Sequence, residues 1–145
     1  MSIFAEQTNN NKSMMNETDY MIGDLVLYGD IIAKISQLTS NKDFLVVKYS
    51  DSEKTPTCQV VFFRQIKPII LTADILLKNG FEMIHIAEYY IFTNKRGLEL
   101  SSDDGCKIFS LSVNVSEYVL DLSIRYVHEL QHLLKMCNMY NRIEL

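Results

Sequence analysis

The chain has no tryptophan, only two prolines and only three cysteines among its 145 residues. Cys58, Cys106 and Cys137 are odd in number and widely spaced, and no Cys-x-x-Cys pair occurs. This pattern excludes a disulfide framework and a cysteine-rich zinc module. We expect the cysteines to be small buried hydrophobic residues in a reducing compartment.

Long apolar runs are also missing. No stretch approaches the roughly 18 uninterrupted apolar residues that a membrane-spanning helix needs. The N-terminus lacks the basic region and apolar run of a signal peptide. The expected location is therefore the cytoplasm, with no membrane as a partner.

Positive charge is in short supply, with 14 Lys and Arg against 18 Asp and Glu, a formal net charge of −4. Affinity for nucleic acid comes mostly from clustered Lys and Arg on phosphates. Between residues 21 and 67 the balance is +1, six basic minus five acidic residues. Nucleic acid is therefore an unlikely partner by charge, although a local basic patch is compatible with these counts.

The length and the apolar fraction of 48% suit one compact domain or two very small ones. Residues 1–20 are polar and rich in asparagine, which indicates a tail. We divide the remainder into a small β-barrel-like subdomain at 21–67 and an α+β subdomain at 68–145.

The first subdomain shows four short strand patterns, at residues 25–28, 31–35, 44–49 and 57–63. Gly29-Asp30 between the first two is the kind of pair that a two-residue type II′ hairpin turn prefers. Such strands predict an SH3-like four-stranded antiparallel barrel or sheet. Phe62 and Phe63 are consecutive and so point to opposite faces of a strand, and core packing is expected for both.

The second subdomain begins with a short helix that Thr72 caps and that ends before Gly80. Three or four antiparallel strands follow, between residues 82 and 113, while 117–122 fits either a strand or a helix. An amphipathic helix over 123–137, with Ser123 as its N-cap, completes a helix–antiparallel strands–helix unit. The fold class is therefore α+β.

The last helix carries the one pattern that suggests chemistry, His128-Glu129-x-x-His132. This spacing places two imidazoles one helical turn apart to bind zinc, with a carboxylate beside them as general base, as in metalloproteases. On the helical wheel, however, His128 and His132 lie opposite the apolar stripe, beside Arg125 and Lys135. These fixed cations disfavour a dication, and no third ligand follows at the required spacing.

We therefore expect solvated histidines, with no catalytic residue, metal or cofactor, and keep a zinc metalloprotease as an alternative. The same four side chains, Arg125, His128, His132 and Lys135, form a modest cationic patch that suits a small anionic ligand.

Three segments resemble a family of small uncharacterised proteins of phages, prophages and mobile elements of gut Bacteroidetes: residues 22–27 (IGDLVL), 66–72 and 76–81 (IKPIILT, LLKNGF), and 126–134 (YVHELQHLL). That family carries no assigned activity, and its last helix commonly has Asn at the position of His132. Residues 1–20 lie outside the resemblance.

The resemblance implies a genomic setting in which small non-enzymatic proteins act inside the host cell. The expected function is binding of a host or phage protein. Sequestering a small anion such as a signalling nucleotide is the first alternative, and homo-oligomers are compatible with both.

Overall fold

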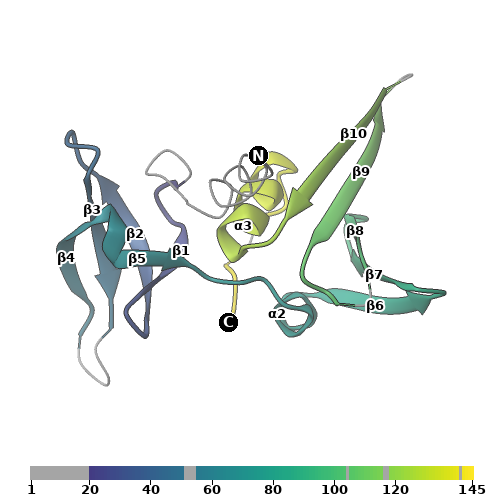
Figure 1. Ribbon diagram of the computed structural model, residues 1–145, viewed down its shortest axis with the longest axis horizontal. Helices are drawn as coiled ribbons and strands as arrows, with labels where there is room; N and C mark the ends of the chain where they lie inside the picture. The colour runs from purple at the N-terminus through teal and green to yellow at the C-terminus, as the bar shows by residue number, and fades with distance from the viewer. Residues whose placement is uncertain (1–19, 51–54, 104, 116–117, 141) are drawn as a thin grey trace, which may run out of the picture. The chain divides into compact units, whose positions relative to one another are not determined.

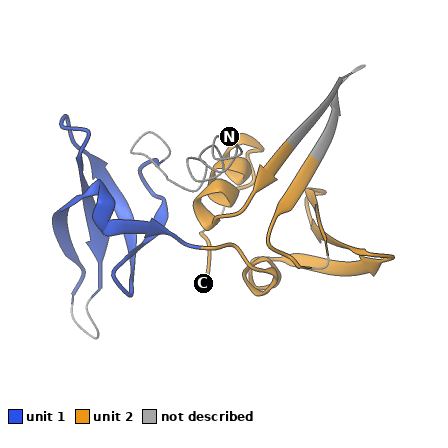
Figure 2. Ribbon diagram, viewed as in Figure 1, with its two compact units in different colours: residues 1–69 blue, residues 70–145 orange. Residues whose placement is uncertain are grey.

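The computed structural model describes residues 20–50, 55–103, 105–115, 118–140 and 142–145 (Figure 1). The chain forms two compact units, residues 1–69 and 70–145 (Figure 2). Each unit contains one five-stranded antiparallel sheet, and helices α2 and α3 belong to the second, so the predicted α+β class is confirmed. No helix in the described part of the chain is long and apolar enough to cross a membrane.

The sheet of unit 1 has the strand order β4-β3-β2-β1-β5. Its elements are β1 (Leu25–Tyr28), β2 (Ile31–Leu38), β3 (Phe44–Tyr49), β4 (Thr57–Phe62), the 3₁₀ turn η2 (Phe63–Gln65) and β5 (Ile66–Pro68). The four predicted strands are all present, and β5 is an addition that pairs with β1. Strands β4 and β5 are the two edges and are not paired with each other among the described residues, so no closed barrel is seen.

The hairpin β1–β2 turns at Gly29-Asp30, as predicted. Tyr28 pairs with Ile31, which leaves two residues in the turn, and Gly29 has a φ of +60°. Only glycine takes that conformation without a steric penalty, so this dipeptide sets the register of both strands.

One face of this sheet forms a core, because alternate strand residues point the same way. The buried residues are Tyr20, Val26, Ala33, Ile35, Leu45, Val47, Val61 and Ile66. Tyr20 contradicts its assignment to a solvated tail, because its ring packs on Phe63 at a centroid distance of 5.9 Å. Residues 1–19 lie outside the described residues.

Asp24 places a buried carboxyl group just before β1. Asp24 is fully buried, and its Oδ2 accepts a hydrogen bond from the Met21 N–H at 2.7 Å. Its backbone carbonyl accepts from Ile35 N–H at 2.9 Å, which ties the entry turn to β2. A charged acceptor makes such bonds stronger than those between neutral groups, so Asp24 is a structural residue.

The sheet of unit 2 has the order β10-β9-β8-β7-β6. Its elements are α2 (Ala73–Lys78), β6 (Phe81–Ile86), β7 (Tyr89–Asn94), β8 (Glu99–Ser102), β9 (Phe109–Val115), β10 (Tyr118–Ile124) and α3 (Val127–Met136). The core contains Phe92 and Phe109, whose rings meet edge to face at 5.5 Å, together with buried leucines of α3.

Helix α2 has the predicted ends. Thr72 Oγ1 accepts from the Ile75 N–H at 3.2 Å, and Gly80 beyond the last turn has a φ of +89°. The side chain of the adjacent Asn79 makes two hydrogen bonds with the backbone of Glu144: Nδ2 donates to the Glu144 C=O at 2.7 Å, and Oδ1 accepts from the Glu144 N–H at 2.8 Å. Glu144 is thus held beside the end of α2.

Helix α3 begins later than predicted, at Val127. Ser123 is not its cap, because the hairpin β9–β10 continues past it, pairing Ser123 with Ser110 and Ile124 with Phe109. The ambiguous stretch 117–122 lies in this strand from 118 onward. The helix ends in a Schellman motif in which Asn138 has a φ of +55° and Met139 N–H donates to Leu134 C=O at 2.8 Å.

The cysteines are less buried than expected. Cys58 is exposed, and Cys106 and Cys137 are partly exposed. Cys58 lies on edge strand β4 and pairs with Lys48, on the face of the sheet that is opposite to the core. Its position on that face, rather than its apolar character, decides its exposure.

Candidate functional site

The histidines of α3 do not share a solvated face. His128 is only 1% exposed and Gln131 is fully buried, whereas His132 is partly buried. The His128 ring stacks on Tyr126 at 5.8 Å and meets His132 edge to face at 5.6 Å. The expectation of solvated histidines is therefore wrong for His128.

His128 is buried because α3 buries a wide arc of its surface. Beyond the apolar stripe, α3 also buries the polar residues His128 and Gln131, and the chain after the helix contacts Gln131. Gln131 Nε2 donates to the Tyr140 hydroxyl at 3.1 Å, and Ile143 is also buried. A helical wheel with one apolar stripe predicts a broad solvent-exposed face, and the exposed face of α3 is narrower than that.

Glu129, the residue that would be the general base of a zinc protease, acts as a cap. Its Oε1 accepts from the backbone N–H groups of Arg125 at 2.8 Å and Tyr126 at 3.1 Å. These bonds satisfy amides at the start of α3, and a carboxylate there suits the helix dipole. Glu129 thus has a structural role at the start of α3.

The remaining conditions for a metal are also unmet in the described part of the chain. No group of three or more His, Cys, Asp or Glu side chains is arranged there to hold a metal ion. His128 and His132 alone supply two donors, and a catalytic zinc site uses three protein ligands.

The four residues of the predicted cationic patch differ in exposure. Arg125 is exposed at the end of β10, while Lys135 is partly buried and places its Nζ 5.0 Å from the centre of the Tyr140 ring. That cation–π contact occupies Lys135 within the unit. Of the four candidate residues, Arg125 is exposed, His132 and Lys135 are partly buried, and His128 is buried.

A different region, the hairpin β6–β7, exposes large apolar side chains. Ile84 is 54%, Ile86 53% and Tyr89 56% exposed. Register pairs Ile84 with Ile91 and Ile86 with Tyr89, so the four lie together on one side of the hairpin, which we call the hairpin apolar face. The opposite side carries Phe92 in the core. Exposed apolar clusters of this kind mark interaction sites.

Strand β6 also has an open edge. It is the last strand of its sheet among the described residues, and five of its six residues are exposed. The turn residues are Ala87 and Glu88, so Ile86 and Tyr89 form the closing hydrogen-bonded pair, and pairs alternate from there. The backbone groups of Met83 and His85 therefore point away from β7.

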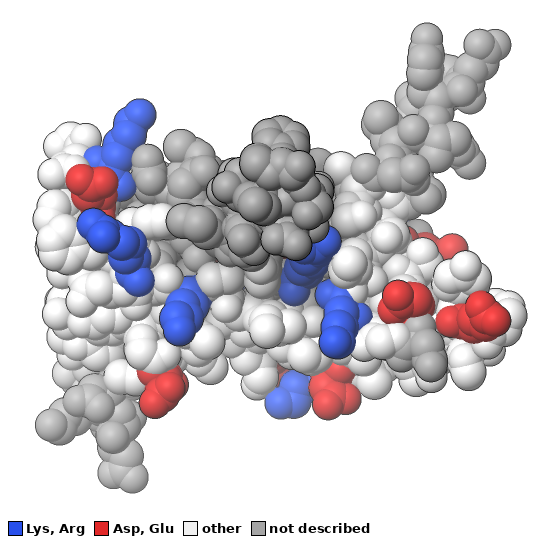
Figure 3. Space-filling view, viewed as in Figure 1, with Lys and Arg blue, Asp and Glu red and all other residues white. Residues whose placement is uncertain are grey.

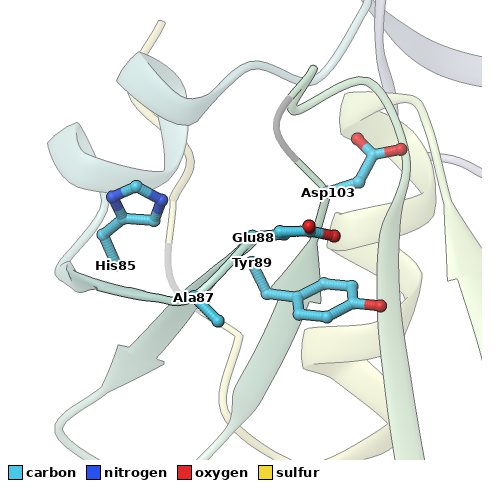
Figure 4. Close-up of a pocket in the computed structure, with 5 residues that line it drawn as sticks. All are labelled: His85, Ala87, Glu88, Tyr89 and Asp103. Atoms are coloured by element: carbon cyan, nitrogen blue, oxygen red, sulfur yellow. The ribbon is translucent and has the colours of Figure 1, made fainter.

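The tip of the hairpin is held in a strained turn beside a shallow hollow. Ala87 has a φ of +53°, a conformation that costs energy in any residue with a Cβ. The hollow, about 520 Å³, is lined by His85, Ala87, Glu88, Tyr89 and Asp103. Figure 4 shows the His85 ring apart from the two carboxylates, and it stacks instead on Tyr90 at 4.3 Å.

Sequence reasoning identified these strands but missed their surface. The signal was present, because apolar residues occur at both parities of β6: Phe81 and Met83 on one side, Ile84 and Ile86 on the other. Such a run is typical of a strand covered on both faces. Here one face is left uncovered.

Compared with protein-family models, curated proteins and solved structures, the chain has no match.

Proposed function

We propose that the protein is a non-enzymatic binding module that captures an extended segment of another protein along β6. The observation that carries this proposal is the conjunction of an open strand edge with the hairpin apolar face beside it. An added strand would pair with the outward backbone groups of Met83 and His85, and its apolar side chains would pack beside Ile84 and Ile86.

The edge has little of the usual protection, with Glu82 as its one carboxylate. Natural proteins guard exposed edges with lysine, proline, bulges or a covering element. Strand β6 has no lysine or proline, and its pairing with β7 is regular over all six residues. A segment that alternates apolar and polar residues is the partner chemistry that fits.

The setting of this function is also part of the proposal. We place it in the cytoplasm of a bacterial host, where an accessory protein of a phage or mobile element acts on a host or phage protein. For unit 1 we propose that the five strands curl in the manner of an SH3-like barrel, which its single buried face supports.

The test is affinity capture by the full chain and by two variants of one residue. Met83→Pro removes the outward N–H that a partner strand would use and keeps the bonds between β6 and β7. Met83→Thr keeps that N–H and serves as the matched control. We expect the wild type and Met83→Thr to retain a protein that Met83→Pro loses.

Equal capture by all three proteins would overturn the edge as the binding site. If Met83→Pro does not fold, Ile84→Lys tests the same surface, since this exposed side chain contributes little to the core. A concentration-dependent dimer that Met83→Pro abolishes would make a second copy of the chain the partner.

A further inference from the structure

The sheet of unit 1 has an outer face that the proposed function does not use. This outer face consists of the strand residues that alternate with the core, among them Ile32, Lys34, Lys48, Val60, Phe62 and Lys67, all exposed. Every charged residue on the five strands is a lysine, since β1 to β5 contain no Asp or Glu. In the described part of unit 1 the charge is +2, five basic minus three acidic residues.

Two of these lysines oppose each other. Lys34 on β2 pairs directly with Lys48 on β3, so their side chains leave the same face from neighbouring interior strands. Like charges at directly opposite positions destabilise a sheet. A sequence that keeps such a local conflict usually does so at a functional site, and an anion between the two ammonium groups would remove the repulsion.

An aromatic pair completes the outer face. Phe62 on β4 lies opposite Phe44 on β3 with ring centroids 4.4 Å apart, and Phe62 is 47% exposed. The expectation that Phe62 packs in the core is therefore wrong, whereas its neighbour Phe63 does pack there. Phe44 is four residues from Lys48, about 13 Å along the strand, and Val46 and Val60 pair between them. The face thus offers cations at one end and aromatic rings at the other.

We propose that this outer face binds single-stranded nucleic acid. Phosphates would lie on Lys34 and Lys48, with Lys67 at the margin, and an unpaired base would stack on Phe62. A sheet face away from the edges presents side chains and no free backbone groups, so an acidic peptide would gain side-chain contacts there but no backbone pairing. Stacking on an aromatic ring is an interaction that every base makes. Figure 3 shows Lys and Arg side chains, together with some Asp and Glu side chains, on the face of unit 1 that it draws.

This inference revises the conclusion from net charge, because the acidic residues of the described part of unit 1 lie in turns and not on the strands. With about three phosphate contacts, log affinity should fall against log salt with a slope of about −2. The site is independent of β6, so its failure would leave the proposed function standing.

The experiment is fluorescence anisotropy of the full chain with a labelled oligothymidine of about a dozen nucleotides, at low and physiological salt. We expect binding with the slope given above. Lys34→Thr with Lys48→Thr should weaken it about tenfold or more, and Phe62→Leu about fivefold or more. The matched control is Lys42→Thr, which removes an exposed lysine from a turn of the same unit.

Absence of binding at low salt, or binding that the lysine pair does not influence, would overturn the proposal. So would equal or tighter binding of polyglutamate or of vesicles with anionic lipids, which would assign the face to acidic protein or to membrane. Circular dichroism of each variant separates lost binding from lost folding. The variant with Lys34→Thr and Lys48→Thr should remain folded, because the substitutions remove a repulsion between two lysines.

Discussion

The two units differ in how closely the burial of a residue follows its polarity. In unit 1 apolar strand residues such as Ile35 and Val47 face the core and lysines face outward, as the alternation of the sequence predicts. In unit 2 the helix α3 buries His128 and Gln131, while the hairpin β6–β7 exposes Ile84 and Ile86. Residue type therefore agrees with burial over much of the unit 1 sheet, with exceptions such as Asp24 and Phe62, and it disagrees at α3 and at the hairpin β6–β7 of unit 2.

The difference teaches that residue type indicates burial only where an element has one covered and one open side. The sheet of unit 1 has this arrangement. Helix α3 is covered over most of its circumference, and the hairpin β6–β7 leaves the side that carries Ile84 and Ile86 uncovered. A buried polar residue indicates a structural role, and a cluster of exposed apolar residues indicates a binding surface.

The sharpest test of this contrast is the pair of histidines in α3. His128→Ala should lower the free energy of unfolding by about 2 to 4 kcal/mol, as the loss of a large buried side chain does. His132→Ala, a partly exposed neighbour, should cost less than about 1 kcal/mol. Urea denaturation measures both. Equal small effects would show that His128 is a surface residue after all.

The buried carboxylate of unit 1 should give the next largest effect. Asp24→Ala removes the acceptor of the Met21 N–H and should cost about 2 kcal/mol. The control is Asp30→Ala in the exposed turn after Gly29, with a cost of about 0.5 kcal/mol or less. If the two substitutions cost the same, Asp24 does not support the entry to the sheet.

Glu129 distinguishes a cap from a catalytic base. Glu129→Ala should cost about 1 kcal/mol, because two amides lose their acceptor. Glu129→Gln keeps an acceptor oxygen and should cost clearly less, although it would abolish proteolysis by a zinc enzyme. A melting temperature that rises with added zinc, and a peptidase activity lost in Glu129→Gln, would restore the metalloprotease alternative.

The smallest expected effect has the opposite sign. Lys34→Thr should raise the free energy of unfolding by about 0.5 kcal/mol, because it ends the repulsion by Lys48 and places a β-branched residue in a strand. Thermal unfolding at low salt, where screening is weakest, is the measurement. No gain in stability at low salt would mean that the two ammonium groups avoid each other at no cost.

Local chemistry predicted the parts of the fold that depend on a few neighbouring residues. The Gly29-Asp30 turn, the cap at Thr72 and the stop at Gly80 follow from backbone preferences that need no tertiary contact. The start of α3 did not follow, because Ser123 is a good cap by itself and is taken up by a strand whose partner is β9. Whether Ser123 caps a helix or belongs to a strand is decided by the backbone pairing of β10 with β9.

The candidate site shows the same division. The spacing His128-Glu129-x-x-His132 was visible in the sequence, but the burial of His128 and the capping contacts of Glu129 are seen only in the tertiary structure. The exposed edge of β6 and the lysine pair of β2 and β3 arise from strand order and register, to which residues far apart in the sequence contribute.

By itself, the sequence determined the fold class, the two-residue turn and both ends of α2, because these depend on interactions within a few residues. Only the tertiary structure decided which polar groups are buried and which apolar groups are exposed. The physical reason is that burial is a property of the surroundings of a side chain, and these surroundings are supplied by segments that the local pattern does not contain.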